Sequence, residues 1–401
     1  MKNLFILSNS PGEVAGWVKP VANELSKRNC GARVTLAVLP CPYASGMEAR
    51  YGREIEGIDA ATTFRALWQT GDRSVRKEKN LVLQLGGDPM FGAFLSLKFG
   101  AGWMIYTSRP KWKSRITHYF IPDEKAEARF IGKRIQKERY TRVGNLALDS
   151  IPRDMDKNRA KEKLGLGAEE KMLAFLPGSR PFEYEQGFPF FARAAEEVQA
   201  AFPEFHTFMP VAPTVDETIL KDGLKRYGYS WLGGDRVERI VTKNGHISLV
   251  WSDTDPLLKA ADLAVAFPGT NNLQMAAMGT PLVMFAPLNE AENIPLDGIP
   301  GIFPTSSAPA KRLKKKLVFW YSGKHRFVSL PNILSGEMIV PEYRGAITPH
   351  VVADVVKDLL GSPEKLAAIQ EGYRKIDFEF GAAEKIAAKI EGFFCPGQSG
   401  S

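Results

Sequence analysis

Two short segments in the second half of the chain carry residues that could bind an anion. The first reads Leu176-Pro-Gly-Ser-Arg180, with Glu183 three residues beyond the arginine, and it joins an apolar run to a helical pattern. Backbone N–H groups at Gly178 and Ser179 and the positive end of a helix attract an anion, while the Arg180 guanidinium suits phosphate. Because Pro-Gly-Ser with a serine cap is also an ordinary turn, this segment alone fits either a turn or a phosphate site.

The second segment, Phe267-Pro-Gly-Thr-Asn-Asn-Leu-Gln274, has the same order of apolar run, small-residue turn and helical pattern. Gly269 lets the backbone approach a ligand, Thr270 and Asn271 can donate hydrogen bonds, and a helix N-terminus favours negative charge. Both segments stand where strands of an open α/β sheet would end, and such sheets bind ligands there. Two anion-binding turns in one half indicate a nucleotide diphosphate that is held without a metal.

Two further turns, in the first half of the chain, carry carboxylates. One is Ser8-Asn-Ser-Pro-Gly-Glu-Val-Ala-Gly16, which contains Glu13, and the other is Gln84-Leu-Gly-Gly-Asp88. At the end of a strand, Asp88 could remove a proton from an attacking hydroxyl group. An aspartate before a proline is equally typical of a helix N-cap, and position alone does not separate the two interpretations.

The elements that must position these turns alternate between strand and helix. Apolar runs at 4–8, 34–39, 81–85, 104–107 and 118–121 predict buried parallel strands, with helices at 16–28, 89–99 and 123–134 between them. After a polar stretch at 149–171, a second series of the same kind begins at 172. The pattern predicts an α/β fold with two Rossmann-like parallel-sheet domains, at 1–148 and 165–345, and a helical C-terminal tail at 346–395 that packs back on the first domain.

Composition and missing motifs exclude several other classes of protein. The 401 residues include 24 Phe, 11 Tyr and 7 Trp, which excludes intrinsic disorder. The sequence holds no complete GxGxxG, no GxxxxGKS/T and no GxSxG, and its five histidines are too far apart for a helical metal pair. Its three cysteines form no CxxC, as expected in a reducing cytoplasm, and we expect neither a secretory signal nor a membrane-spanning segment.

Most of the net charge of +8 comes from residues 311–327, which hold seven Lys and Arg and no acid. Such a run is usually the solvated face of a helix. The Phe, Trp and Tyr between its cations also favour a membrane surface, because anionic lipids attract cations and Trp and Tyr prefer the interface. Nucleic acid is disfavoured, since no nucleic-acid-binding motif accompanies the charge. The residues alone leave both a solvated helix face and peripheral contact with an anionic membrane open.

Five motifs, in this order along the chain, resemble those of the lipid-A-disaccharide synthases. They are GE-x-x-G (Gly12 to Gly16), GGD (Gly86 to Asp88), LPGSR-x-x-E (Leu176 to Glu183), GT-x-x-L (Gly269 to Leu273) and VSLPNIL (Val328 to Leu334). The resemblance runs from residue 3 to about residue 360. It implies a GT-B glycosyltransferase, whose first domain binds the acceptor and whose second binds the UDP-sugar donor across a cleft.

The resemblance also implies an activity and residue roles. An acylated glucosamine would pass with inversion from its UDP conjugate to a glycolipid acceptor, as in lipid A disaccharide formation, and UDP would be released. Asp88 would be the general base and Arg180 would stabilise the departing diphosphate. The other positions implied to bind substrate are Gly12, Glu13, Gly16, Gly178, Ser179, Glu183, Gly269, Thr270, Asn271, Asn272, Gln274 and Asn332. Neither cofactor nor metal is expected, the location would be cytoplasmic and peripheral to the inner membrane, and a homodimer is open.

Four positions depart from the motifs of that family, and so does the stretch at 107–112, where the family has a tryptophan-rich segment. Ala15 and Trp17 replace the serine and the acid of GE-x-SGD, Asn145 replaces the histidine of a GH pair, and Gln274 replaces a glutamate. A relative with a different sugar or lipid, or a UDP-sugar-binding relative without catalysis, therefore stays open. A UDP-N-acetylglucosamine 2-epimerase-like isomerase is a further alternative, which would need a histidine near the phosphate turns, with His206 as the candidate.

Overall fold

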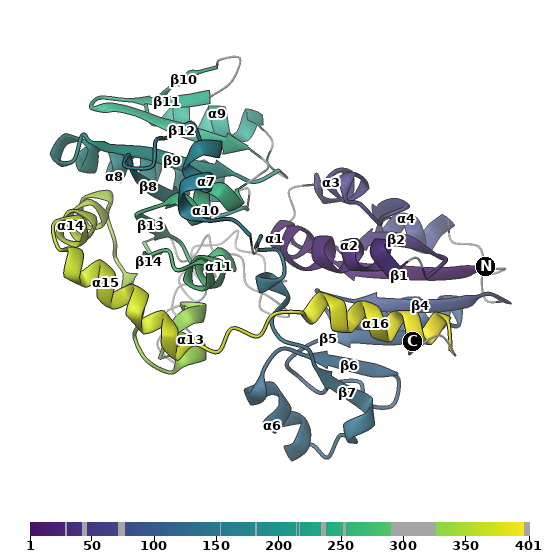
Figure 1. The fold of residues 1–401 in the computed structure, drawn as a ribbon. Coiled ribbons are helices and arrows are strands. Elements are labelled where there is room, and N and C mark those ends of the chain that lie inside the picture. Colours follow the sequence, from purple (N-terminus) through teal and green to yellow (C-terminus); the bar gives the residue numbers. More distant parts are fainter. Residues whose placement is uncertain are drawn as a thin grey trace, which may run out of the picture. The chain divides into compact units, whose positions relative to one another are not determined.

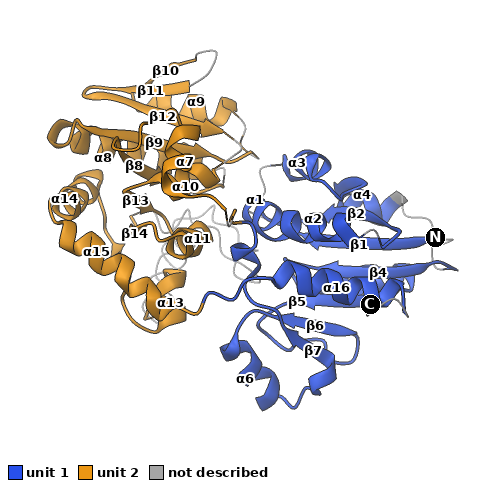
Figure 2. Cartoon of the chain, in the orientation of Figure 1, with its two compact units in different colours: residues 1–150, 378–401 blue, residues 151–377 orange. Residues whose placement is uncertain are grey.

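A computed structural model describes residues 1–401 except 29, 42–45, 71–76, 153, 181–182, 214, 216, 234–237, 252–253, 290–325 and 397–401. The chain forms two compact units (Figure 1), unit 1 from residues 1–150 and 378–401 and unit 2 from residues 151–377 (Figure 2). Nearly all of the basic segment 311–327 lies outside the described residues, so its expected membrane contact stays a prediction. Among the described residues, no helix is long and apolar enough to cross a membrane.

Unit 1 contains a seven-stranded sheet in the order β3-β2-β1-β4-β5-β6-β7, and every neighbouring pair is parallel. Its strands are β1 (Lys2–Ser8), β2 (Ala32–Val38), β3 (Ala60–Thr63), β4 (Lys79–Gln84), β5 (Gly102–Tyr106), β6 (His118–Ile121) and β7 (Tyr140–Arg142). Its helices are α1 (Pro11–Glu13), π-helix η1 (Val14–Val18), α2 (Lys19–Arg28), α3 (Glu48–Glu54), α4 (Phe64–Thr70), α5 (Pro89–Phe99), α6 (Glu124–Gly132), the short 3-10 helices η3 (Lys137–Arg139) and η4 (Leu146–Leu148), and α16 (Ala382–Phe394). The five predicted strands are present, and β3 and β7, which are only four and three residues long, escaped prediction.

Two apolar clusters cover the two faces of this sheet. One joins α2 and α16 to the sheet through buried side chains such as Val21, Leu25 and Ile386. The other joins α4, α5 and α6 to the opposite face through Phe64, Phe99 and others. Parallel strands with both faces covered read as continuous apolar runs, which is why the sequence pattern located them.

Unit 2 contains an eight-stranded sheet in the order β10-β11-β12-β9-β8-β13-β14-β15. Its strands are β8 (Lys171–Leu176), β9 (Phe205–Val211), β10 (Ser230–Leu232), β11 (Glu238–Thr242), β12 (Gly245–Trp251), β13 (Leu263–Ala266), β14 (Leu282–Pro287) and β15 (Glu342–Gly345). Its helices are α7 (Lys157–Lys163), π-helix η5 (Glu183–Gly187), α8 (Phe188–Ala201), α9 (Glu217–Arg226), α10 (Asp255–Ala260), α11 (Asn271–Met278), α13 (Leu330–Ser335), α14 (Pro349–Leu360), α15 (Pro363–Gly372) and the 3-10 helix η7 (Tyr373–Lys375). Neighbouring strands are parallel except for the two pairs β10–β11 and β11–β12 at one edge, which are antiparallel. The predicted α/β class with two Rossmann-like sheets is confirmed.

The C-terminal helices are divided between the units. Helices α14 and α15 belong to unit 2, whereas α16 belongs to unit 1, as Figure 2 shows. Asp149 fixes the start of α16, because its carboxylate accepts the N–H groups of Gly381 at 2.7 Å and Ala383 at 2.6 Å. An apolar stripe that includes Ile386 and Ile390 then buries α16 against α2. The end of the chain therefore completes the core of unit 1.

Strand order places the four candidate turns. In unit 1 the order reverses between β1 and β4, and in unit 2 between β8 and β13. The turns that follow these four strands are the ones that the sequence singled out. Ligands of open α/β sheets bind at such reversal points, at the carboxyl ends of the strands.

Candidate active site

The turn after β8 is closed by a carboxylate of its own chain. Glu183, the first residue of η5, accepts the N–H groups of Ser179 at 2.7 Å and Arg180 at 2.8 Å through Oε2. Gly178 has a φ of +106°, and a Cβ on it would lie 2.1 Å from the same oxygen, so only glycine leaves room for the carboxylate. The amides of Ser179 and Arg180 are therefore bound to Glu183 in this structure.

The Arg180 side chain stays accessible beside that carboxylate. Its Nη1 lies 3.6 Å from Glu183 Oε1, and 39% of the arginine side chain is exposed, against 11% for the glutamate. Burial raises the pKa of the Glu183 carboxyl, and the Arg180 charge and the two amides oppose that rise. In this turn the guanidinium, and not the pair of amides, is the group that can meet an anion from solution.

The turn after β13 has open amides instead. Within the part of the chain that the structure describes, no hydrogen bond involves the N–H groups of Gly269, Thr270 or Asn271, and Thr270 makes no side-chain cap for α11. A Cβ on Gly269 would meet nothing within 4 Å. From Asn272 onward the amides are used, since its N–H donates to Gly269 O at 3.3 Å. This helix N-terminus can receive an anion without displacing a protein group.

The two turns leave the sheet side by side. Strands β8 and β13 are neighbours, and Phe267 N–H donates to Leu176 O at 3.2 Å. The Phe267 ring also packs on Phe191 of α8, with 4.3 Å between ring centroids. A guanidinium from one turn and unbonded amides from the other thus lie at the carboxyl end of the same two neighbouring strands. Such a combination of groups suits phosphate.

Two predicted site residues on α11 are buried. Asn272 is 1% exposed and Gln274 is 6% exposed. Neither the nitrogen nor the oxygen of the Asn272 side-chain amide has a hydrogen-bond partner in the described structure. Burying such a group without a hydrogen bond costs about 1–3 kcal/mol of folding free energy. Asn272 therefore destabilises unit 2 unless another molecule or a rearrangement supplies a hydrogen-bond partner for its amide.

In unit 1 the turns after β1 and β4 also touch. A Cβ on Gly86 would lie 2.0 Å from Glu13 Oε2 and 3.1 Å from Asn9 Oδ1, so the glycine lets both oxygens approach the second turn. Gly12 lies in α1, and Gly16 lies in η1, where a Cβ would meet nothing within 4 Å. The sequence did not single out Asn9, although it stands between Ser8 and the cap Ser10.

Asp88 is both a helix cap and an exposed carboxylate. Its Oδ1 accepts the N–H of Met90 at 2.8 Å, which caps α5. Gln84 holds the turn below it, because its Nε2 donates to Gly86 O at 3.0 Å and to Asp88 O at 2.9 Å. A carboxylate has about four acceptor sites, so the cap leaves Asp88 able to accept a further proton. Gln84 was missed as a site residue, although it begins the Gln-Leu-Gly-Gly-Asp segment.

Two of the departures from the family motifs meet at one residue. The Trp17 ring packs edge to face on Tyr106, with 5.4 Å between ring centroids. The Tyr106 hydroxyl donates to Gly144 O at 3.2 Å, directly before Asn145. Asn145 accepts the N–H of Ala147 at 3.1 Å and so caps η4. Ala15 lies in η1, two residues before Trp17. Trp17 and the residue before Asn145 thus both contact Tyr106 in unit 1.

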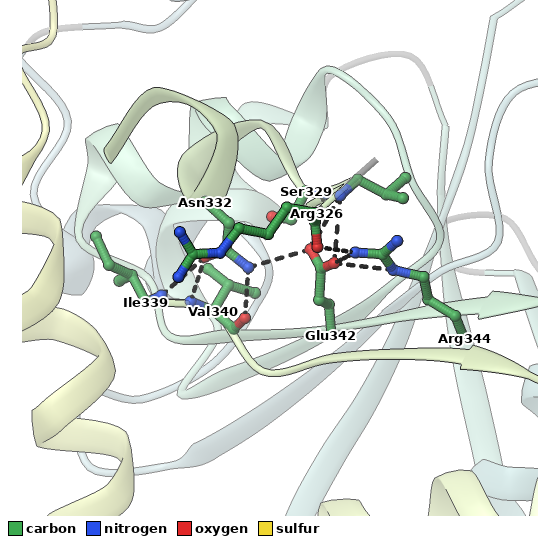
Figure 3. Close-up of polar contacts among 8 residues, drawn as sticks. Arg326, Ser329, Asn332, Ile339, Val340, Glu342 and Arg344 are labelled. Atoms are coloured by element: carbon green, nitrogen blue, oxygen red, sulfur yellow. Dashed lines mark hydrogen bonds and ion pairs between the residues drawn. The ribbon is translucent and has the colours of Figure 1, made fainter. Parts of the chain in front are cut away.

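Asn332 uses its whole side-chain amide within unit 2. Its Nδ2 donates to Val340 O at 2.8 Å and to Glu342 Oε2 at 3.1 Å, and its Oδ1 accepts the N–H groups of Ile339 at 2.9 Å and Val340 at 2.8 Å. Figure 3 shows this network, with Glu342 between Asn332 and Arg344. An amide offers two donors and two acceptors. Asn332 therefore has no hydrogen bond left for a substrate and fixes α13 instead.

His206, the histidine that the sequence offers for an epimerase, does not lie at these turns. His206 is the second residue of β9, at the amino end of the parallel strands, and its Nε2 lies 2.8 Å from Glu170 Oε1. The phosphate turns stand at the opposite, carboxyl end. In the described part of the chain, no group of three His, Cys, Asp or Glu lies close enough to hold a metal ion.

Comparisons with known proteins show which families this chain is similar to. Residues 126–291 match the family model described as lipid-A-disaccharide synthetase. The lipid-A-disaccharide synthase of Anaeromyxobacter sp. (strain K) is 29% identical over 237 residues, 58% of this chain and 52% of that relative. That of Syntrophus aciditrophicus (strain SB) is 26% identical over 249 residues, 61% of this chain and 55% of that relative. The chain is therefore similar to the lipid-A-disaccharide synthases over somewhat more than half of its length.

This synthase-like chain spans about half the length of the curated relatives it matches. Solved structures similar to it include S. aureus MnaA with UDP, with a TM-score of 0.58, 11% identity and coverage of 98% of this chain and 96% of that one. Another is UDP-GlcNAc 2-epimerase from Neisseria meningitidis with UDP-GlcNAc, with a TM-score of 0.52, 12% identity and coverage of 97% and 99%. The calicheamicin glycosyltransferase CalG4 has a TM-score of 0.51, 14% identity and coverage of 100% of both chains. At these identities the likeness shows a GT-B-like fold.

Proposed function

We propose that the protein is an inverting, UDP-sugar-dependent glycosyltransferase that moves an acylated glucosamine to a glycolipid acceptor and releases UDP. The observation that carries this proposal is the open N-terminus of α11 beside Arg180. Three unbonded amides and a guanidinium provide fixed positive charge where a diphosphate would depart. The similarity to lipid-A-disaccharide synthases supports the sugar and lipid classes.

In the proposed reaction an acceptor hydroxyl attacks C1 of the donor sugar as the bond from C1 to the diphosphate oxygen breaks. Asp88 takes the hydroxyl proton, so that the new glycosidic bond forms without a charged intermediate on the acceptor. Negative charge grows on the departing diphosphate. Arg180 and the amides of Gly269, Thr270 and Asn271 stabilise that charge, and because they are already fixed, little reorganisation is needed. No step requires a metal.

The test is release of UDP from a panel of UDP-sugars with glycolipid acceptors, combined with the variant Asp88→Asn. Asparagine is as good an N-cap as aspartate but is not a base. We expect this variant to stay folded and to lose activity by about 10²- to 10⁴-fold, with UDP affinity unchanged. Full activity of Asp88→Asn, or no UDP release with any donor, would refute the mechanism. Uptake of deuterium at C2 of a UDP-sugar in heavy water would identify an isomerase instead.

We propose further that the protein contacts an anionic membrane through α4 and α5. Their outer side exposes Trp68 (44%), Met90 (40%), Phe94 (43%) and Leu97 (48%). Lys98 Nζ lies 5.0 Å from the centroid of the Trp68 ring, and the charged residues of α4 and α5 are Arg65 and Lys98, both cations. Apolar and aromatic groups with cations suit an anionic lipid interface.

Flotation with vesicles tests this contact. We expect binding to vesicles of phosphatidylcholine with phosphatidylglycerol, weaker binding to phosphatidylcholine alone, and a loss of at least about fivefold when Phe94 and Leu97 are both changed to Ser. Equal binding by that double variant would rule out the α4–α5 face and leave the basic segment 311–327 as the candidate. A homodimer stays a prediction, which light scattering in solution would test.

A further inference from the structure

We propose that Glu183 is the positioning residue of the donor turn. It takes the amides of Ser179 and Arg180 for itself and orients the Arg180 guanidinium, so that only the guanidinium and the N-terminus of α11 meet the diphosphate. This inference rests on the proposed function, because it names which groups of the same site touch the phosphates.

The turn after β8 already contains its anion. Successive N–H groups in such a turn form a concave anion site, and here the site is filled by Glu183 Oε2, 2.7 Å from Ser179 N and 2.8 Å from Arg180 N. Both hydrogen bonds end on one carboxyl oxygen, and the Arg180 guanidinium lies 3.6 Å from the other oxygen of the same group. A phosphate could use these amides only by displacing a carboxylate that occupies the space beside Gly178.

Backbone hydrogen bonds and a buried tyrosine fix the residues around Glu183. The N–H groups of Glu183 and Tyr184 donate to Arg180 O at 2.9 and 3.2 Å. Tyr184 is buried, its ring stacks on Phe188 at 4.8 Å, and its hydroxyl accepts the N–H of Ala212 at 2.8 Å. These contacts fix the backbone of Glu183 next to the turn, so its carboxylate starts from a position within reach of both amides.

A carboxylate of the chain also binds the first amides of α13, whereas no carboxylate binds those of α11. At the start of α13, Glu342 accepts the N–H groups of Val328 at 3.2 Å and Ser329 at 3.0 Å. Only α11, of these three places in unit 2, has no internal carboxylate on its first amides. In the proposed site the phosphate therefore binds at the N-terminus of α11, and Glu183 orients the Arg180 guanidinium toward it.

A double-mutant cycle tests whether Glu183 acts through Arg180. The variants are Glu183→Gln, Arg180→Ala and the pair, with Glu185→Gln, an exposed acid of the same π-helix, as the matched control. Glutamine can still accept both amides, so Glu183→Gln should fold normally. We expect it to lower kcat by roughly tenfold, with little change in KM, and to have no further effect in the Arg180→Ala protein. Glu185→Gln should match the parent. An equal loss in both backgrounds would overturn the proposal.

A second readout does not depend on turnover. Hydrogen exchange at the amides of Ser179 and Arg180, followed by NMR, should be slow in the ligand-free protein, fast in Glu183→Ala, and unchanged when UDP is added to the parent. Fast exchange in the parent, or new protection of these amides by UDP, would contradict the proposal. If the parent protein released no UDP from any donor, the proposed transfer would fail while this experiment still decided the role of Glu183.

Discussion

Alanine at two glycines of the donor site should have different effects, although both changes add a single methyl group. We expect the first, at Gly178, to lower the stability of unit 2 and the second, at Gly269, to lower the affinity for UDP. At Gly178, φ is +106° and the new Cβ would lie 2.1 Å from Glu183 Oε2. Alanine in such a conformation costs about 1–3 kcal/mol. The methyl group also drives the carboxylate off two amides, and hydrogen bonds to a charged group contribute about 1.5–3 kcal/mol each. Since the side chain can relax in part, we expect unit 2 to lose about 4 kcal/mol.

At Gly269 nothing lies within 4 Å of the added Cβ, and φ is not in the left-handed region. Gly269→Ala should therefore change the free energy of unfolding by less than about 0.5 kcal/mol. If a phosphate rests on the open amides of α11, it must approach the backbone of this turn closely, and we expect an added methyl group at Gly269 to hinder that approach. We expect UDP affinity to fall by at least about tenfold, which is about 1.4 kcal/mol.

Urea unfolding followed by pulsed hydrogen exchange measures the stability of unit 2 separately from unit 1, and calorimetry measures UDP affinity. A stable Gly178→Ala protein would show that Glu183 does not occupy the turn as described. A Gly269→Ala protein with full UDP affinity would show that the diphosphate does not rest on α11. Either result would refute the assignment of the two turns.

Three further predictions concern stability. Glu342→Ala should lower the free energy of unfolding by about 3–5 kcal/mol, because the variant removes the carboxylate that accepts hydrogen bonds from Arg344 and several buried donors. The control is Glu337→Ala, whose side chain is 61% exposed in the parent and which should cost less than about 0.5 kcal/mol. Similar urea midpoints for the two variants would contradict this role of Glu342. Asp149→Ala removes the acceptor for two amides of α16 and should cost about 1–2 kcal/mol, seen as faster hydrogen exchange across α16. Burial, with the charge of Lys389, lowers the pKa of His118 from 6.5 to about 4. As the pH falls, the unfolded chain therefore binds a proton at this histidine before the folded chain does. The contribution of neutral His118 to the free energy of unfolding is complete above pH 6.5 and is lost as the pH falls toward 4. The loss should reach up to about 3 kcal/mol, and a His118→Gln protein with an equally steep pH dependence would exclude this cause.

Much of the fold could be read from the sequence because its signals are local. Apolar runs mark buried parallel strands, and Asp88-Pro89 and Gly100 mark the two ends of α5, where the structure has an aspartate cap and a left-handed glycine. The antiparallel pair of β10 and β11 was missed, because Ser230–Leu232 and Glu238–Thr242 are short and their partially exposed faces give no long apolar run. The division of the tail at residue 378 was also missed, since it depends on Asp149 meeting the start of α16 across more than 230 residues.

The candidate site was located from sequence, but the use of its groups was not. The pattern Pro-Gly-Ser-Arg with Glu183 beyond it predicts an anion-binding turn, and no spacing rule says that Glu183 itself is the anion. In the same way the sequence marked Asn332, whereas its saturated amide follows from the backbone of Ile339 and Val340 and from Glu342, which are close only in the folded chain. Internal partners that satisfy a polar group are contacts of the tertiary structure, and a motif cannot show them.

Titration of the isotope-labelled protein with UDP, followed by amide NMR, shows directly which groups of unit 2 bind the diphosphate. We expect large shifts at the N–H groups of Gly269, Thr270 and Asn271, a shift at the Arg180 guanidinium, and almost none at the backbone N–H of Ser179. Shifts at Ser179 with none at Gly269, Thr270 and Asn271, or no response to UDP in either turn, would contradict this prediction.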